Sequence, residues 1–363
     1  MDRRGIPAPP HKGRGATFNP KVRFESAQLD PFDDGWGSLV AARAEAPPPP
    51  TEVLPDASRT VIARNDSPDI PFEQSINPYR GCEHGCIYCY ARPSHAYLGL
   101  SPGLDFETRI LAKLDAGPLL ERELGHPGYR CQPIALGTNT DPYQPQERRL
   151  GITRSILKVL AQCRHPVTIV TKSAAVTRDL DLLAPMAADG LARVALSVTT
   201  LEPALARTLE PRAAAPHRRL EAARTLSAAG VPTSVMVAPV IPALNDHEIE
   251  AVLEAAATAG VSQAGYVLLR LPHEVKELFT AWLEVHAPLR AERVLALVRQ
   301  CRGGRLNDPT FGRRMRGEGA YAELIARRFA LAKRRLGLDR KHPPLRTDLF
   351  EPPAAAHRQL RLL

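Results

Sequence analysis

Short β-rich runs alternate with helical stretches through the middle of this 363-residue chain. Runs of β-branched and apolar residues predict strands at 75–79, 133–137, 167–171, 193–198, 234–238 and 265–270. Helical periods between them are clearest at 148–162, 202–229 (with a break near 211–216), 247–260 and 274–285. This order is typical of βα units, in which a helix connects each strand to a parallel neighbour. The sequence therefore predicts an α/β domain with a parallel sheet over residues 61–286.

The two ends of the chain differ from this domain in composition. Residues 1–60 contain four consecutive prolines at 47–50 and no sustained apolar period, so we expect a disordered N-terminal arm. Residues 287–363 are expected to form a basic helical C-terminal extension, with helices at 291–301 and 321–336. This segment has 18 Lys and Arg against 7 Asp and Glu, whereas the whole chain has a net charge of +9. A basic patch favours a polyanionic partner such as nucleic acid, and a solvated arginine-rich surface is the alternative.

Composition also indicates the cellular setting. No apolar run approaches the roughly 18 residues of a transmembrane helix, so no membrane association is expected. The first residues lack the apolar segment of a secretory signal, and six cysteines in a chain of this length are too sparse for a disulfide framework. We therefore expect a cytoplasmic protein in reducing conditions.

Three of the cysteines stand on one short segment. Cys82, Cys86 and Cys89 have the spacing C-x3-C-x2-C. Structural zinc sites and ferredoxin clusters ordinarily have four protein ligands. Three thiolates would bind three irons of a 4Fe–4S cluster and leave the fourth iron open to a substrate or cofactor. A zinc site with His84 or His95 as fourth ligand is the alternative, although the second cysteine pair that zinc motifs usually contain is absent from the sequence.

This cysteine spacing, with Tyr88 just before the third cysteine, resembles the signature loop of the radical S-adenosylmethionine (SAM) superfamily. The run Asn-Pro-Tyr-Arg-Gly-Cys at 77–82, Tyr90 after the cysteines, and Gly-Thr-Asn-Thr-Asp at 137–141 resemble the branch related to spore photoproduct lyase. The resemblance implies a partial (β/α)6 barrel, with the cysteine loop after the first strand at the C-terminal mouth. It also implies a 4Fe–4S cluster, SAM, a reducing electron donor, and a 5′-deoxyadenosyl radical that abstracts hydrogen from a substrate.

The resemblance further implies roles for individual residues. Cys82, Cys86 and Cys89 would ligate the cluster, and Tyr88 would lie against the adenine of SAM. The loop after the second strand would hold the methionine ammonium, and the end of the fourth strand would meet the ribose. The polar residues at these two places are Thr138, Asn139, Thr140, Ser197 and Thr199. An ordinary turn and helix start is the alternative for the first loop.

Three basic residues are candidates to face the substrate. Lys172 ends the third predicted strand, Arg270 ends the sixth, and Arg212 lies in the run Leu-Glu-Pro-Arg at 209–212. Arginine at a barrel mouth suits a carboxylate or phosphate through paired hydrogen bonds, and a structural ion pair is the alternative for each residue.

The hydrogen-atom donor is where the chain departs from the family pattern. Spore photoproduct lyases use a cysteine after the second strand, and residues 137–141 contain none. Cys131 precedes that strand and should point away from the mouth, so Tyr143 or Tyr266 is the candidate donor. The gap argues against photoproduct repair and leaves SAM cleavage untouched.

Two functions follow from these patterns. The first is a lyase-like radical SAM enzyme that abstracts hydrogen from an unidentified substrate, with nucleic acid as one candidate. The alternative is a non-enzymatic nucleic-acid-binding protein whose cysteine loop holds structural zinc.

Overall fold

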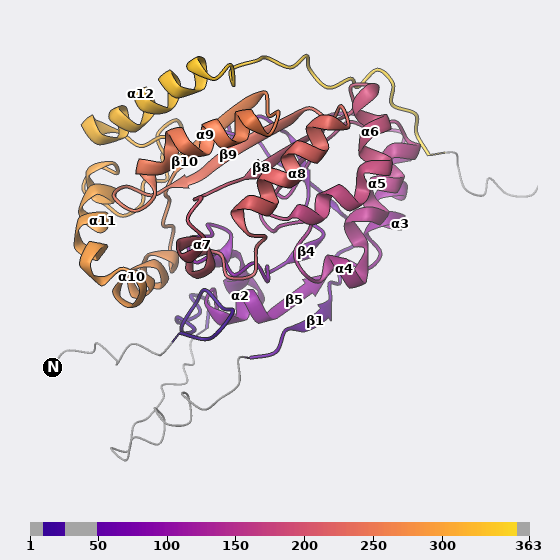
Figure 1. Cartoon of the computed structure of the whole chain (residues 1–363). Coiled ribbons are helices and arrows are strands. Elements are labelled where there is room, and N and C mark those ends of the chain that lie inside the picture. Colours follow the sequence, from indigo (N-terminus) through magenta and orange to yellow (C-terminus); the bar gives the residue numbers. More distant parts are fainter. Residues whose placement is uncertain (1–9, 26–48, 354–363) are drawn as a thin grey trace, which may run out of the picture.

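A computed structural model gives the fold and describes residues 10–25 and 49–353. Its main sheet has seven strands in the order β10-β9-β8-β7-β6-β3-β2. The strands from β3 to β10 are parallel, and β2 runs antiparallel to β3 at one edge (Figure 1). The strands are β2 (Ile62–Arg64), β3 (Gln74–Ile76), β6 (Ile134–Leu136), β7 (Val167–Thr171), β8 (Ala192–Ser197), β9 (Thr233–Val240) and β10 (Gln263–Leu268). The six predicted strands are confirmed, and their order is that of a partial barrel.

Helices follow the strands and lie outside the sheet (Figure 1). The predicted helix at 148–162 is two helices, because Gly151 adopts a left-handed conformation with φ of 65° between them. The predicted break near 211–216 is confirmed, since one helix ends at Leu209 and the next begins at Pro216. The α-helices are α2 (Leu104–Thr108), α3 (Ala116–Leu124), α4 (Glu147–Leu150), α5 (Ile152–Gln162), α6 (Leu180–Ala188), α7 (Pro203–Leu209), α8 (Pro216–Ala228), α9 (Ile249–Thr258), α10 (Val275–His286), α11 (Pro288–Gln300) and α12 (Gly319–Arg335). In the described part of the chain, three 3₁₀ helices accompany them: η1 (Arg92–Leu98), η2 (Ala174–Asp179) and η3 (Asp246–Glu248).

A small second sheet was not predicted. It has the order β1-β5-β4, from β1 (Glu52–Pro55), β5 (Arg109–Ala112) and β4 (Tyr79–Arg80). The prediction of a disordered arm up to residue 60 is therefore wrong for β1, and also for residues 14–17, which are buried against the domain. Residues 1–9 and 26–48 of the expected arm lie outside the described residues.

The hydrophobic core fills the space between the sheet and its helices. Successive residues of β7 alternate between buried and half-buried, as expected for a strand with one face in the core. Burial of each such valine or isoleucine contributes about 1.5–3 kcal/mol. The two predicted C-terminal helices are confirmed as α11 and α12, and α12 packs against α9 and β10 through Ile325 and Phe329. Within the described ranges, we find no helix with the length and apolar character needed to cross a membrane.

Candidate active site

The cysteine loop lies between β4 and η1 and turns on two glycines. Gly81 and Gly85 have φ values of 82° and 67°, in the left-handed region that favours glycine. A Cβ at Gly81 would lie 2.9 Å from the carbonyl oxygen of Phe106. The amide of Cys82 donates to that same oxygen at 2.9 Å, and the amide of Cys89 donates to the carbonyl of Cys86 at 3.2 Å. These contacts fold the loop tightly and fix the backbone that carries the three cysteines.

Burial controls the chemistry of these thiols. Cys82 and Cys86 are only 7% and 8% exposed. Burial raises the pKa of the Cys86 thiol to about 12, although Lys172 opposes this, and it raises the pKa of Cys82 well above its usual range. Buried neighbouring thiols lose their protons readily only to a metal that supplies the compensating positive charge. Two buried thiols and the half-buried Cys89 on one loop therefore fit a cluster that is bound through three irons.

The histidines of the zinc alternative have other partners. His84 Nδ1 lies 3.3 Å from Asp141 Oδ2, and His95 Nε2 lies 3.0 Å from the carbonyl oxygen of Arg109. Across residues 10–25 and 49–353, no three His, Cys, Asp or Glu side chains are gathered closely enough to hold one metal ion. The cysteines of a 4Fe–4S cluster need not be so close, because each binds a different iron. The contacts of the two histidines thus give no support to zinc.

One wall of the site joins Tyr88 to the ends of β7 and β8. The Tyr88 hydroxyl donates to Glu210 and lies 3.2 Å from Thr199 Oγ1. Thr199 Oγ1 in turn donates to Glu210 Oε1 at 2.6 Å. Lys172 Nζ lies 5.7 Å from the centroid of the Tyr88 ring. The structure therefore brings together three predicted site residues from distant parts of the sequence.

A buried ion pair supports this wall, and the sequence did not predict it. Glu210 pairs with Arg219, and both side chains are at most 1% exposed. Burial opposes ionisation of Glu210, but Arg219 and Lys172 hold its pKa at about 2. Burial likewise lowers the pKa of Lys172, yet Cys86 and Glu210 outweigh this and raise it above its ordinary value. Arg219 also donates to the carbonyl of Ser197 at 3.0 Å, which fixes the end of β8. Ser197, a predicted SAM-binding residue, is buried there.

Asn77 organises the predicted loop after β6. Its Oδ1 accepts from the amide of Asn139 at 3.0 Å and from Thr138 Oγ1 at 3.4 Å. Thr140 Oγ1 donates to the carbonyl of Tyr79 at 2.7 Å, whereas the Asn139 side chain is exposed. The polar groups of 138–140 therefore also fix the loop itself, and the Asn-Pro-Tyr run was the available signal for Asn77.

Asp141 connects three elements of the site. Its carboxylate accepts from Thr171 Oγ1 at 2.6 Å and from the amide of Lys172 at 2.7 Å, and it faces His84 of the cysteine loop. Although burial opposes it, His84 and these hydrogen bonds lower the pKa of Asp141 to about 2. A permanently ionised Asp141 thus ties the cysteine loop to the ends of β6 and β7.

Tyr143 and Tyr266 are the candidate hydrogen-atom donors. Among the described residues, neither forms a hydrogen bond or a ring contact with the cysteine loop. Tyr143 is buried, and its hydroxyl donates to Asp179 Oδ2 at 3.0 Å in a network that joins α5 to η2. Tyr266 packs on Phe329 of α12, with ring centroids 4.8 Å apart. Cys131 lies before β6, at the end of the strand opposite the site, as predicted. The contacts of Tyr143 thus give no support to its predicted catalytic role.

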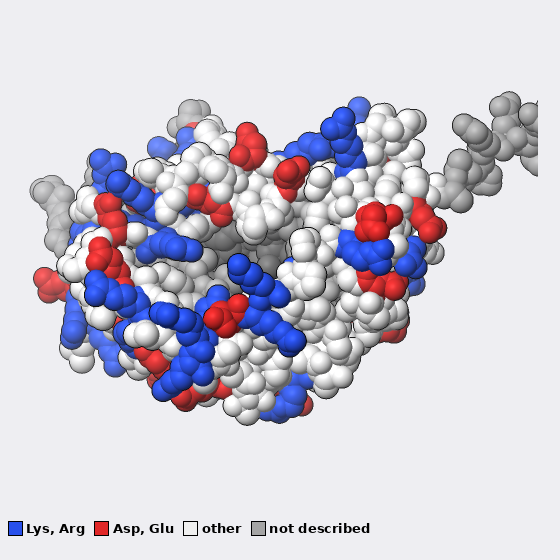
Figure 2. All heavy atoms as spheres, turned by 90° about the horizontal axis from the view of Figure 1, so that it is seen from above, with Lys and Arg blue, Asp and Glu red and all other residues white. Residues whose placement is uncertain are grey.

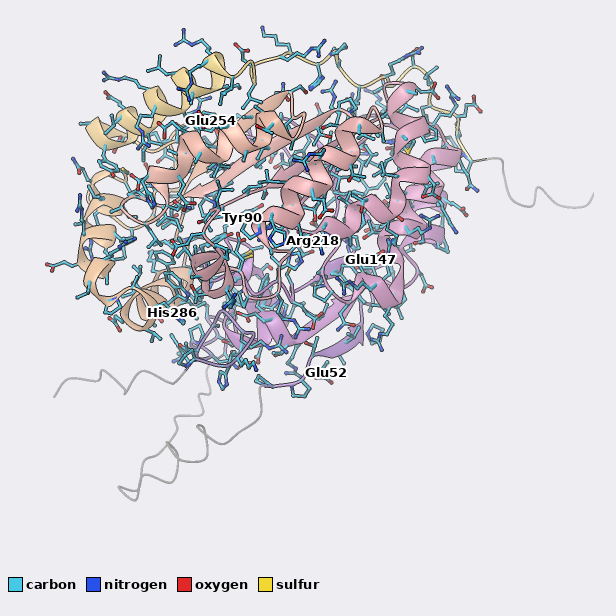
Figure 3. The ribbon with its side chains drawn as sticks, viewed as in Figure 1. Glu52, Tyr90, Glu147, Arg218, Glu254 and His286 are labelled. Atoms are coloured by element: carbon cyan, nitrogen blue, oxygen red, sulfur yellow. The ribbon has the colours of Figure 1, made fainter. Side chains whose placement is uncertain are left out.

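The outer wall of the mouth is basic and aromatic. Tyr90 is 46% exposed, and its hydroxyl donates to the carbonyl of Thr138. The guanidinium carbon of Arg270 lies 5.3 Å from the centroid of the Tyr90 ring. Burial and the nearby Arg314 lower the pKa of Arg270. Figure 3 labels Tyr90 near the centre of the view, close to α7, with Arg218 of α8 to its right.

Arg302 joins this wall to β10. Its guanidinium donates to the carbonyls of Leu268 and Leu269 at 2.9 and 2.7 Å. It also donates to the carbonyls of Arg313 and Arg314 at 3.0 and 2.9 Å. The connector between α11 and α12, residues 302–318, is thereby held beside the end of β10.

Residues 76–256, which contain the cysteine loop and the ends of β3, β6, β7, β8 and β9, match the family model described as the radical SAM superfamily. The chain belongs to the radical SAM superfamily. It is an enzyme of the radical SAM type, and such enzymes generally use a 4Fe–4S cluster and SAM.

Relatives of this radical SAM protein occur in bacteria and archaea. The chain is 36% identical over 291 residues to the uncharacterized protein Rv2578c of Mycobacterium tuberculosis, a match that covers 79% of this chain and 82% of the relative. It is 29% identical over 173 residues to the uncharacterized protein MJ0683 of Methanocaldococcus jannaschii, covering 48% and 62% of the two chains.

Solved structures of spore photoproduct lyase share the fold. One variant superimposes with a TM-score of 0.55 at 18% identity and 79% coverage of both chains. Another, with bound AdoMet and dinucleoside spore photoproduct, gives 0.54 at 18% identity and 78% coverage. These similarities confirm the predicted partial radical SAM barrel.

Proposed function

We propose that Cys82, Cys86 and Cys89 hold a 4Fe–4S cluster and that SAM binds across the mouth beside it. Together the two would supply reductive cleavage of the sulfonium and a 5′-deoxyadenosyl radical, which takes a hydrogen atom from the substrate. The observation that carries the proposal is that the loop of Cys82, Cys86 and Cys89, of which the first two are buried, lies with Tyr88, Thr199 and Lys172 at the ends of parallel strands.

The residues of the chain would position SAM and exclude water. The Tyr88 ring, fixed by Glu210, offers a flat apolar face beside Cys86. Thr138, Asn139 and Thr140 would meet the methionine end of SAM, and Ser197 and Thr199 the ribose end. Lys172 carries a positive charge beside Cys86, which suits the carboxylate of SAM or a negatively charged cluster.

We further propose that the substrate is a nucleic acid. Arg270 stacks over Tyr90, and Arg314 stacks over Phe311 at 4.6 Å from the ring centroid. Tyr90 and Phe311 are about half exposed, so bases could stack on them while Arg270 meets a phosphate. Arg314 is paired with Asp69 and would hold Phe311 in place. The spore photoproduct lyase structure that contains a dinucleoside supports this substrate class. Because residues 137–141 have no cysteine, we expect a different hydrogen-atom donor and a different reaction outcome.

The basic C-terminal segment supplies only part of this surface. Figure 2 shows Lys and Arg interleaved with Asp and Glu around a hollow on the face it draws. On α12, Arg328 and Arg335 pair with Glu250 and Glu254 of α9. The support for nucleic acid binding therefore comes from the connector 302–318 and Arg270 rather than from α12.

Anaerobic reconstitution with iron and sulfide tests the proposal. After addition of dithionite and SAM, we expect formation of 5′-deoxyadenosine in the wild type and none in Cys86→Ala. Cys131→Ala is the matched control, because Cys131 lies at the opposite end of β6, and it should retain the activity. Stoichiometric zinc without a cluster or product would favour the zinc-binding alternative. Single-stranded DNA and RNA are the first substrates to add.

A further inference from the structure

An N-terminal segment lies directly on the outer side of the cysteine loop. We call residues 14–20 the strap; in Figure 1 it is part of the indigo segment that lies beside α2. A Cβ at Gly15 would lie only 1.9 Å from the carbonyl oxygen of Gly85, between Cys82 and Cys86. A Cβ at Gly103 would lie 2.1 Å from the carbonyl oxygen of Phe18. Both contacts are backbone against backbone, which only glycine permits at these distances.

The strap completes a buried ion pair behind the cysteines. Glu107 accepts hydrogen bonds from the amides of Gly15 and Ala16 at 2.9 and 2.8 Å. The same carboxylate pairs with Arg92, and neither side chain is exposed. Arg92 also donates to the carbonyls of Gly85 and Cys86 at 3.1 and 2.9 Å. The strap, Glu107, Arg92 and the cysteine loop thus form one continuous hydrogen-bonded unit.

Further contacts fasten both ends of the strap. Arg14 donates to the carbonyls of Glu107 and Pro49 at 3.0 and 2.6 Å. At the other end, Ser101 Oγ donates to the carbonyl of Pro20 at 2.8 Å. Between them Ala16 is fully buried, in the same apolar cluster as Cys86, Ile87 and Tyr88. Residues 14–17 are all buried, so this part of the strap excludes water from the outer side of the cysteine loop.

We propose that the strap seals the cluster site against solvent, and that Gly15, Glu107 and Arg92 are positioning residues for the cluster. The proposal rests on the proposed cluster ligands but goes beyond them, because the strap lies outside the barrel and outside the segment that matches the superfamily. A displaced strap would expose the backbone of 85–87 and remove two of the donors that hold Glu107. Water, oxygen and chelators would then reach the cluster through the loop.

Two variants displace the strap from different sides. Gly15→Val adds a side chain against Gly85, and Gly103→Ala adds one against Phe18. Gly128→Val is the matched control, because Gly128 is exposed and a Cβ there would approach only His126. Displacement is measured by the rate of trypsin cleavage after Arg14, which is 7% exposed. Cluster protection is measured in the reconstituted proteins by the rate at which an iron chelator bleaches the cluster absorbance, without SAM.

We expect both variants to be cleaved faster after Arg14 and to bleach roughly fivefold faster or more than wild type, while Gly128→Val matches wild type on both measures. Thermal melts of the apoproteins check folding, and Gly103→Ala carries the test if Gly15→Val fails to fold. Bleaching at the wild-type rate, with or without faster cleavage, overturns the proposal. The proposed function is tested separately: if the reconstituted wild type shows no cluster absorbance, the proposed function fails before the strap is tested.

Discussion

The cysteine loop and the connector 302–318 lie at the same end of the barrel but are built in opposite ways. The cysteine loop is buried, and its charged neighbours are paired, Arg92 with Glu107 and Arg219 with Glu210. The connector is largely exposed and rich in arginine, although Arg313 pairs with Glu318 and Arg314 with Asp69. Arg302, its one buried guanidinium among the described residues, binds only carbonyl oxygens. The first region suits a cofactor that must be held rigidly, and the second suits an anionic substrate that must enter and leave.

This contrast predicts that substitutions in the two regions affect different properties. Loss of a partner near the cysteine loop leaves a buried charge, which costs folding free energy. Loss of Arg270 beside the connector removes a partly buried charge that has no ion pair among the described residues, so it should alter binding more than stability. The predictions below test this difference, beginning with the largest expected effect.

Arg92→Met should destabilise the fold most. It leaves the Glu107 carboxylate buried without its ion partner and removes the donor to the carbonyls of Gly85 and Cys86. We expect a loss of about 3–5 kcal/mol in the free energy of unfolding, measured with urea on the apoprotein. Arg109→Met is the matched control, because its pair with Glu52 is about half exposed, and it should lose less than about 1 kcal/mol. Equal losses in the two variants would contradict the contrast.

Asp141→Asn should remove a pH-dependent part of the stability. The Asp141 carboxyl titrates at about 2 in the folded chain, against 3.8 for an ordinary aspartate. Because its pKa is lowered, its contribution of about 2 kcal/mol is present above pH 4 and lost as the pH falls toward 2. The difference in unfolding free energy between wild type and Asp141→Asn should therefore shrink from pH 5 to pH 2.5. A difference that stays constant across this range would show that Asp141 is not ionised as the structure implies.

The sequence could predict the features that depend on residues close together in the chain. It could not predict those that depend on contacts between distant segments. The strands, and the position of the cysteine loop, Lys172 and Thr199 at one end of the sheet, followed from periodicity and from the rule that parallel strands end at one edge. The strap did not, because residues 14–20 have no apolar period and gain their place from backbone contacts with Gly85 and Gly103. The pairs Arg92–Glu107 and Arg219–Glu210 were also invisible, since sequence spacing does not show which charges are buried together.

Tyr143 shows that a position after a strand does not determine where a side chain points. Its place in a polar run made it a candidate for chemistry, and that role stays a prediction; in the structure its hydroxyl donates to Asp179. A strand end brings the backbone to the mouth, but side chains further along the loop can turn back into the core.

Arg270→Gln should weaken nucleic acid binding while leaving stability nearly intact. Arg270 forms no ion pair with any of the described residues; it contacts Met315 and Tyr90. Its positive charge is therefore available to a phosphate. For a single-stranded oligonucleotide we expect roughly threefold to tenfold weaker binding and a slope of log K against log salt that is smaller by about 0.7. Arg327→Gln is the control, because this α12 arginine is exposed and pairs with Glu323 of the same helix. Unchanged affinity and slope in Arg270→Gln would remove the nucleic acid proposal and leave SAM cleavage unaffected.

Arg335→Ala should have the smallest effect of all. Arg335 Nη2 lies 2.6 Å from Glu254 Oε1, but both side chains are more than half exposed, so water and salt screen the pair. We expect a change below about 0.5 kcal/mol in the free energy of unfolding, measured with urea. Figure 3 labels Glu254 on α9, on the far side of the sheet from Tyr90, so nucleic acid affinity should also stay at the wild-type value. If Arg335→Ala instead weakened oligonucleotide binding as much as Arg270→Gln, the basic surface of α12 would take part in binding, and the substrate would extend well beyond the barrel mouth.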